Sequence, residues 1–204
     1  MKGFIYIAGS FETVNRSKCG RGKGWIDNDP HFWDDPPTWE ICRNDLRRKA
    51  GNGDHIFFVL PKHARHPQMV FGYMRIAEEI ITHVEAFDRA DLAKKRMQNK
   101  NPNGNIIVNS RGGYNKFDYG AHEGIFHKIK TRYAVGDPHT SLFLNDRQIR
   151  ALAPGFIKIL KDVLGGSGSR PIDFISRYGR ELTESQAKRF LSWLRDGVKS
   201  TASE

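Results

Sequence analysis

The sequence predicts an α+β fold: a small, partly open β-barrel flanked by helices, with a C-terminal helical extension. Three observations lead to this class. Apolar runs of strand length recur along the 204 residues without regular interleaving by helices. Two stretches near the C-terminus carry apolar residues at helical spacing. The hydrophobic content of 38% and the aromatic content of 11% are enough for a packed core.

The first third of the chain predicts strands around one long loop and one helix. Residues 4–8 are apolar and end at a Gly-Ser pair, so they predict a buried strand. Residues 11–37 lack helical periodicity and are interrupted by Gly and Pro, which predicts a long structured loop. Thr38 is the expected N-cap of a helix that ends near Ala50. Two further strand-like runs, separated by a Pro-bounded loop, are residues 54–60 and 69–80.

The middle of the chain predicts one polar helix among further strands. Asp88 is the expected cap of a helix that runs to about Gln98, and a turn with the sequence Asn-Pro-Asn-Gly follows it. Three strand-like runs come after the helix, over residues 105–109, 125–131 and 141–144.

Two amphipathic helical stretches are expected after residue 144. Asn145 or Asp146 caps the first, and Pro154 is expected to divide it into two helices, because proline fits a first turn but not a helix interior. Thr183-Glu184-Ser185-Gln186 is a capping box that begins a helix to about Gly197. The predicted parts are a barrel domain with its flanking helices, a Gly/Ser-rich linker and a C-terminal helical appendage, over residues 1–164, 165–171 and 172–204.

Positive charge points to a polyanionic partner. The chain has 33 Lys+Arg and 23 Asp+Glu, a formal net charge of +10. Cations that neutralise phosphates release counterions, which supplies the sequence-independent part of nucleic-acid affinity. A solvated basic surface is the alternative for one cluster, but three clusters at this charge favour nucleic acid. The clusters are Arg16, Lys18, Arg21 and Lys23; Arg43, Arg47, Arg48 and Lys49; and Lys94, Lys95, Arg96 and Lys100. The expected phosphate contacts are Arg16, Lys18, Arg21, Lys23 and Arg47.

Secreted and membrane-spanning classes are not expected. The N-terminal apolar run is short and is predicted to be a strand rather than a signal peptide. No stretch approaches the ~18 apolar residues of a membrane span, so no membrane partner is expected. Cys19 and Cys42 cannot form a disulfide framework or a four-cysteine zinc site. A reduced, cytoplasmic protein is therefore predicted.

Aromatic residues among the cations predict a pocket for a base. Trp25, Trp33 and Trp39 lie between the first basic cluster and the expected basic helix. A Gly-rich loop contains Ser110 and Arg111, and Tyr119 follows it. Single-stranded or flipped bases are held by stacking on aromatic rings and by hydrogen bonds from nearby polar groups. A tryptophan in a loop can equally be a core residue. Phe32 lies among these tryptophans, and at least one of the four aromatic residues is expected to contact the ligand.

No complete catalytic constellation is present. The chain has no Walker loop, no GxSxG and no HExxH motif, and no catalytic residue, metal ligand or cofactor is predicted. Asp118, His122 and Glu123 offer a carboxylate–imidazole group, so a metal-dependent nuclease or base-modifying enzyme is the alternative. A protein-interaction module is a further alternative, with the helices after residue 145 as its interface.

Three segments resemble the PUA-like superfamily. They are Trp39-Glu40-Ile41-Cys42-Arg43-Asn44-Asp45-Leu46-Arg47, Gly53-Asp54-His55-Ile56-Phe57-Phe58 and Gly72-Tyr73-Met74-Arg75-Ile76. The resemblance is to the EVE, YTH and ASCH-like branches, and especially to the nucleotide-modification-associated domains of prokaryotes and phages. It covers roughly residues 4–145 and implies a small β-barrel that recognises a modified base flipped into an aromatic-lined pocket.

The resemblance also implies roles for individual residues. Ser10 matches the polar position that meets the base edge, and Trp39, Arg43 and Asn44 match positions near the pocket. Gly53-Asp54 matches a structural turn. The chain departs from the family where residues 11–37 separate the first strand from the expected helix, and Trp25 or Trp33 is then a candidate for the pocket wall.

The predicted function is a non-enzymatic reader of modified bases. Nucleotide-binding residues are expected to be Ser10, Trp25, Trp33, Trp39, Arg43, Asn44, Ser110, Arg111 and Tyr119. Phosphate contacts set the register and the pocket sets specificity. DNA is favoured over RNA as the partner, and a separate effector enzyme is an open second partner.

Overall fold

The computed structural model describes residues 1–8, 29–32, 34–40, 42–62, 67–98, 104–118, 120 and 122–202. The chain divides into two compact units, each assembled from separated stretches. Unit 1 contains residues 1–11, 53–75 and 140–204, and unit 2 contains residues 12–52 and 76–139.

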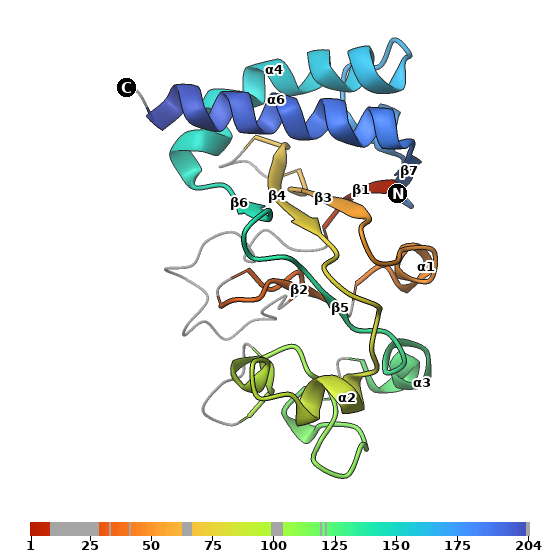
Figure 1. The fold of residues 1–204 in the computed structure, drawn as a ribbon. Helices are drawn as coiled ribbons and strands as arrows, with labels where there is room; N and C mark the ends of the chain where they lie inside the picture. The colour runs from red at the N-terminus through yellow and green to blue at the C-terminus, as the bar shows by residue number, and fades with distance from the viewer. Residues whose placement is uncertain are drawn as a thin grey trace. The chain divides into compact units, whose positions relative to one another are not determined.

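Unit 1 is built on a five-stranded mixed sheet (Figure 1). Its strands are β1 (Gly3–Ile7), β3 (His55–Val59), β4 (Val70–Arg75), β6 (Leu142–Phe143) and β7 (Arg180–Leu182), in the order β6-β4-β3-β1-β7. β1 and β3 are parallel, with Ile5 opposite Phe57, and the other pairs are antiparallel. β3 is buried along its whole length, as its unbroken apolar run requires.

Three helices complete unit 1: α4 (Asp146–Leu164), α5 (Pro171–Ile175) and α6 (Glu184–Ala202). α4 and α6 run side by side (Figure 1). The Phe190 ring of α6 lies 5.7 Å from the Phe57 ring of β3, so α6 packs on the face of the sheet that carries the Phe57 side chain. A Cβ added at Gly3 would lie 2.7 Å from the Ala187 Cβ, so glycine permits the close approach of α6 to β1.

The helix ends in unit 1 follow the predicted capping signals. Asn145 accepts from the Gln148 N–H and Thr183 accepts from the Gln186 N–H, which confirms both starts. Pro154 does not divide the first stretch, because α4 is one helix of 19 residues. Proline removes one intrahelical hydrogen bond, but the buried apolar face on either side of it keeps the helix continuous.

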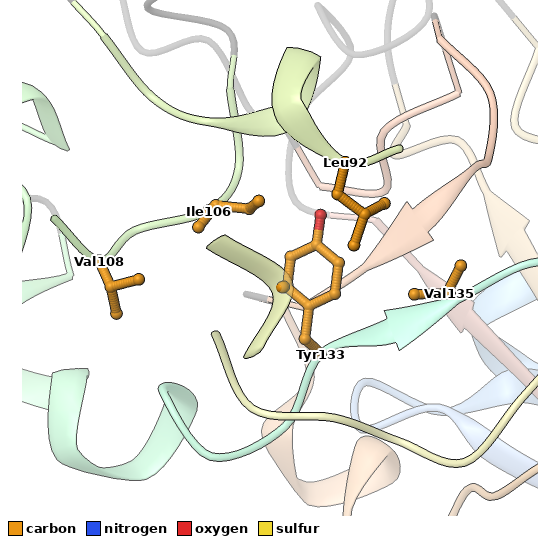
Figure 2. Close-up of a cluster of buried hydrophobic side chains, with 6 residues drawn as sticks. Leu92, Ile106, Val108, Tyr133 and Val135 are labelled. Carbon is orange, nitrogen blue, oxygen red and sulfur yellow. The ribbon is translucent and has the colours of Figure 1, made fainter. Parts of the chain in front are cut away.

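Unit 2 consists of short elements. Its strands β2 (Thr38–Trp39) and β5 (Ala134–Val135) form a two-stranded sheet. Its α-helices are α1 (Asn44–Arg47), α2 (His83–Asp88) and α3 (Phe126–Ile129), and its 3-10 helices are η2 (Ala93–Lys95), η3 (Lys116–Asp118) and η4 (Glu123–Ile125). The Tyr133 ring lies in a buried cluster with Leu92, Ile106, Val108 and Val135 (Figure 2).

The α+β class is confirmed, but the predicted barrel is not. The described strands form an open sheet in unit 1 and a separate two-stranded sheet in unit 2, and none of them closes a barrel. The chain also divides differently from the predicted boundaries. The expected C-terminal appendage contributes β7 and α6 to unit 1, because β7 pairs with β1 and the apolar face of α6 packs on the sheet.

Four predictions of local structure in unit 2 are wrong. Residues 105–109 form isolated bridges at Ile106 and Val108 where a strand was expected. Thr38 begins a strand instead of capping a helix, and the helix in that region covers only Asn44–Arg47. Thr82 caps α2, while Asp88 ends it. Residues 125–131 form helical turns where a strand was expected.

Within the described residues, no helix combines the length and apolarity that crossing a bilayer requires.

Candidate functional site

Unit 2 buries a group of charged and titratable side chains. Each of these side chains is at most 2% exposed, although such residues are rarely buried without a specific partner. We name this group the Glu40 cluster, and it consists of Asp29, His31, Glu40, Arg47, His83 and Lys95. Groups with strongly perturbed pKa values concentrate at functional sites, which makes this cluster the leading candidate.

Asp29 fixes the backbone around Glu40. Its Oδ1 accepts from the Glu40 backbone N–H at 2.8 Å, and its Oδ2 accepts from the Cys42 backbone N–H. Arg43 then adopts a left-handed conformation with φ of 56°, and α1 begins at the next residue. This turn places Glu40 inside unit 2 while the residues that follow it, Cys42, Arg43 and Asn44, are half-buried.

The Glu40 carboxyl is the exceptional group of the cluster. Neither of its oxygens has a well-formed hydrogen bond to a described residue, although both are fully buried. Burial raises its pKa well above the ordinary value, and the neighbouring Asp29 carboxylate raises the pKa further, against the opposing charges of Arg47 and Lys95. A neutral carboxyl presents one O–H donor beside an acceptor oxygen. Apart from the adjacent Asp29 carboxylate, no described group engages the Glu40 carboxyl, so Glu40 keeps hydrogen-bonding capacity inside unit 2.

Two basic groups lie near this carboxyl. Lys95 Nζ lies 2.6 Å from His31 Nδ1, and it also donates to the backbone oxygens of His31, at 3.5 Å, and Asp34. Burial lowers the pKa of Lys95 to about 8. Burial, together with the Arg47 charge, lowers the pKa of His83 to about 3, so this imidazole is neutral at pH 7. The cluster thus combines a carboxyl with a raised pKa, an imidazole that is neutral at pH 7 and a lysine with a pKa of about 8.

A chain of neutral polar groups lies beside the cluster. The Tyr133 hydroxyl donates to Asn105 Oδ1 at 2.9 Å, and Asn105 Nδ2 donates to Thr38 Oγ1 at 2.7 Å. Burial raises the pKa of Tyr133, and the nearby Glu40 raises it further. These groups are rigidly held because each has a defined partner, which suits the recognition of a fixed pattern of donors and acceptors.

The Gly-rich loop of residues 109–114 is ordered by one side chain. Asn109 Oδ1 accepts from the backbone N–H of Arg111 at 2.9 Å and of Gly113 at 3.1 Å, and Nδ2 donates to the Tyr114 carbonyl at 3.1 Å. Gly112 has φ of 73°, which glycine adopts without strain. Ser110 and Arg111 are therefore exposed on a fixed loop.

A second titratable group lies next to this loop. His122 Nδ1 lies 3.0 Å from Asp118 Oδ1, and the Tyr114 hydroxyl donates to Asp118 Oδ2. Burial and this hydrogen bond raise the pKa of Tyr114 to about 12. The predicted neighbourhood of Asp118 and His122 is present. Among the described residues, however, no three His, Cys, Asp or Glu side chains are arranged to hold a metal ion.

The structure separates the predicted nucleotide-binding residues. Trp39 is fully buried and so is a core residue of β2. Arg43 and Asn44 are half-buried and follow Glu40 along the chain, whereas Ser110 and Arg111 belong to the Asn109-ordered loop. Ser10, Trp25, Trp33 and Tyr119 lie outside the described residues.

One predicted phosphate contact needs correction. Arg47 has no exposed surface, and it donates to the Arg132 carbonyl at 3.2 Å, while Arg132 donates to the Arg47 carbonyl at 2.9 Å. The Arg47 guanidinium is thus engaged by the backbone of Arg132, so Arg47 is a structural cation of unit 2 and not the expected phosphate contact. The other four expected contacts, Arg16, Lys18, Arg21 and Lys23, lie outside the described residues.

Sequence reasoning missed the centre of the candidate site. Glu40 stands in the strand-like run Thr-Trp-Glu-Ile-Cys, and this isolated charge in an apolar run was a usable signal. Lys95 had no such signal, because it belongs to a basic cluster that is typical of solvated surfaces.

The comparisons add no assignment. No family model, curated protein or solved structure matches this chain. The resemblance to PUA-like proteins therefore stays a prediction, and the candidate site stands on its geometry alone.

Proposed function

We propose that this protein binds nucleic acid and recognises a modified base with the Glu40 cluster of unit 2. The observation that carries the proposal is the Glu40 carboxyl, which is fully buried, has a pKa that its surroundings raise and, apart from the adjacent Asp29 carboxylate, has no hydrogen-bond partner among the described residues. Because an unsatisfied buried polar group costs about 1–3 kcal/mol, a ligand that supplies its partners gains affinity there.

The hydrogen-bonding pattern of the cluster suits a base edge. Bases present neighbouring donors and acceptors on one edge, and a neutral carboxyl presents the complementary pair. A flipped base is read by such groups in a snug site away from water. Arg43 and Asn44 are the half-buried groups that follow Glu40 along the chain, so they are the proposed contacts nearest to solvent.

Exposed cations near the Asn109-ordered loop are the proposed phosphate contacts of unit 2. Tyr114 and Phe126 are in edge-to-face contact at 5.3 Å, which joins this loop to α3. Exposed cations flank these two aromatic residues, and they are Arg111, Lys116, Lys128 and Lys130. Phosphate contacts of this kind position the strand, while the cluster supplies the choice of base.

The PUA-like resemblance points in the same direction. The segment that carries it includes Glu40 together with Arg43 and Asn44, the proposed contacts nearest to solvent. The proposal therefore includes a base-reading role of the PUA-like kind, with DNA favoured over RNA.

The test is a comparison of two substitutions at Glu40. Binding is measured to short oligonucleotides, plain and carrying modified cytosines, adenines or thymines. Glu40→Met removes the donor and the acceptor and is expected to reduce the preference for the recognised base at least tenfold, about 1.4 kcal/mol. Glu40→Gln keeps a neutral donor–acceptor pair and is expected to lose less. Affinity for the plain oligonucleotide stays within about twofold in both.

Glu79→Met is the matched control, because Glu79 is an exposed glutamate of the same unit. The proposal is wrong if the wild-type protein shows no base preference at any salt concentration, or if folded Glu40→Met retains the preference in full.

A second candidate function rests on the Asp118–His122 contact. A carboxylate that holds an imidazole nitrogen at 3.0 Å orients it for proton transfer, so a base-modifying enzyme is the alternative. Incubation with oligonucleotides followed by mass spectrometry tests this idea. Product formation that His122→Asn abolishes and that the exposed control His127→Asn retains supports the enzyme, and no product with the wild type removes it.

A further inference from the structure

The solvent-facing side of α4 carries a row of cations that the sequence clusters did not include. The four residues are Arg147, Arg150, Lys158 and Lys161, and all of them are exposed. At about 100° per residue, these positions lie within an arc of about 80°, and they extend over about 21 Å of the helix. We name them the α4 row.

The four cations of the row belong to one continuous helix. Pro154 lies on the same exposed side as the row, midway between Arg150 and Lys158. The opposite side is fixed by buried apolar side chains, among them Ile149 and Phe156, and the Phe156 ring stacks on Trp193 of α6 at 6.0 Å. The cations therefore project from a rigid support, which reduces the ordering cost when they bind a ligand.

Most of the net positive charge belongs to the unit that contains this helix. Unit 1 contains 15 Lys and Arg and 8 Asp and Glu, so its formal charge is 15 − 8 = +7 of the total of +10. Unit 2 contains 18 Lys and Arg and 15 Asp and Glu, so its formal charge is 18 − 15 = +3. The excess positive charge that predicts a polyanionic partner is thus concentrated in unit 1, whereas the three basic clusters of the sequence belong to unit 2.

Ion pairing differs between individual cations of α4 and α6. On α6, Lys188 forms an ion pair with Glu184 at 2.5 Å. No residue that the structure describes forms an ion pair with Lys158 or Lys161. Asp146 and Asp162 lie on α4 near the two ends of the row.

We propose that the α4 row binds the phosphate backbone of nucleic acid, as a second contact surface that carries no base specificity. The row is long enough for several phosphates, because one strand of duplex DNA presents one about every 3.4 Å along the axis. Arginine also matches phosphate oxygens with two parallel donors. A membrane is a poorer fit, because the apolar side of α4 is buried and cannot enter a bilayer.

The inference shares with the proposed function only the nucleic-acid partner. Base recognition by the Glu40 cluster and phosphate binding by the α4 row are in different units. Either one can fail while the other holds.

The test uses the full chain and a plain 20-base-pair duplex, with affinity measured between 50 and 200 mM salt. The fourfold variant R147Q/R150Q/K158Q/K161Q is expected to bind at least tenfold more weakly at the lowest salt. Each lost phosphate contact reduces the magnitude of the slope of log affinity against log salt by about 0.9. The slope of the fourfold variant is therefore expected to be smaller in magnitude by about 3 to 4. Preference for a modified base is unchanged, which separates this result from the Glu40→Met test.

The matched control is the fourfold variant K188Q/R189Q/R195Q/K199Q on α6, which removes the same charge from the same unit. Equal losses in both variants overturn the proposal, because net charge alone then explains binding. A variant of the row that loses binding to phosphatidylserine vesicles but not to the duplex also overturns it. Circular dichroism and melting curves check that both variants are folded.

Discussion

The two units differ in the kind of side chain that they bury. Unit 1 covers its sheet with long helices whose cations face solvent, and its core is aromatic and aliphatic, as the contact between Phe57 and Phe190 illustrates. Unit 2 has elements of at most 6 residues and buries the charged Glu40 cluster. Apolar burial stabilises unit 1 without specific partners, whereas unit 2 depends on particular hydrogen bonds, because each unpaired buried polar group is costly.

This difference suggests where specificity lies. An apolar core tolerates similar side chains if their total volume is kept. A buried polar group specifies its partner, and a cluster in which Glu40 has unused hydrogen-bonding capacity is suited to a ligand. The four predictions below test the contrast, in order of decreasing effect.

The largest effect is expected from truncation in the core of unit 1. Phe190 is fully buried against Phe57, so Phe190→Ala should lower the free energy of unfolding by about 3–5 kcal/mol. Urea unfolding measures the loss, and hydrogen exchange of β1 and β3 amides locates it in unit 1. Phe190→Leu should cost clearly less, since it keeps most of the volume. Equal costs would show that packing does not govern this unit.

A somewhat smaller effect is expected from removing a buried cation in unit 2. Lys95→Met leaves the His31 ring and two backbone carbonyls without their donor, at a cost of about 2–4 kcal/mol. The neighbouring Lys94 provides a control, because its side chain is 79% exposed and lies 3.8 Å from Asp34. Lys94→Met should change stability by less than about 0.5 kcal/mol. Similar values for the two variants would contradict the described burial of Lys95.

The third prediction concerns pH. The pKa of Glu40 is raised in the folded state, so above its ordinary value of 4.5 the folded protein binds more protons than the unfolded chain, and stability falls as pH rises. His83 acts in the opposite direction between pH 3 and 6.5, because its folded pKa is lowered to about 3.

Comparison of the wild type with Glu40→Gln cancels the His83 contribution. The wild type should lose stability relative to this variant from pH 5 to pH 6, by at most about 1.4 kcal/mol, which corresponds to one proton over one pH unit. Urea unfolding at the two pH values gives the difference, and a difference that does not change with pH would show that Glu40 ionises normally.

The smallest effects are expected at helix caps. Thr183 in unit 1 and Thr82 in unit 2 each accept from the backbone N–H three residues later, at 3.2 and 3.1 Å. Replacement of either by Ala should cost about 1 kcal/mol, and replacement by Ser should cost less. Hydrogen exchange should report the first loss in α6 and the second in α2. A change in both helices from one substitution would show that the units unfold together.

The sequence predicted unit 1 better than unit 2, and local signals explain why. The strands around Ile5, Phe57 and Tyr73 are apolar runs, and the caps at Asn145 and Thr183 are contained within four consecutive residues. Long elements with such signals can be read from the chain. Pro154 was the exception, since packing on both sides of it kept α4 whole.

The errors in unit 2 arise from partners that are distant in sequence. Thr38 and Trp39 form a strand because β5 pairs with them from residues 134–135, which no local pattern shows. Lys95 is buried because acceptors from His31 and Asp34 surround its ammonium group. A basic run without these partners is typical of a solvated surface, so the sequence pattern predicted the wrong environment for Lys95.

The sequence by itself therefore determined the α+β class, the apolar strands of unit 1, its helix caps and the excess of positive charge. Only the tertiary structure decided the strand order β6-β4-β3-β1-β7, the burial of Arg47 and Lys95, and the interaction between the Glu40 and Asp29 side chains. The physical reason is range. Periodicity and capping act within a few residues, whereas the burial of a charge depends on hydrogen-bond partners supplied by remote parts of the chain.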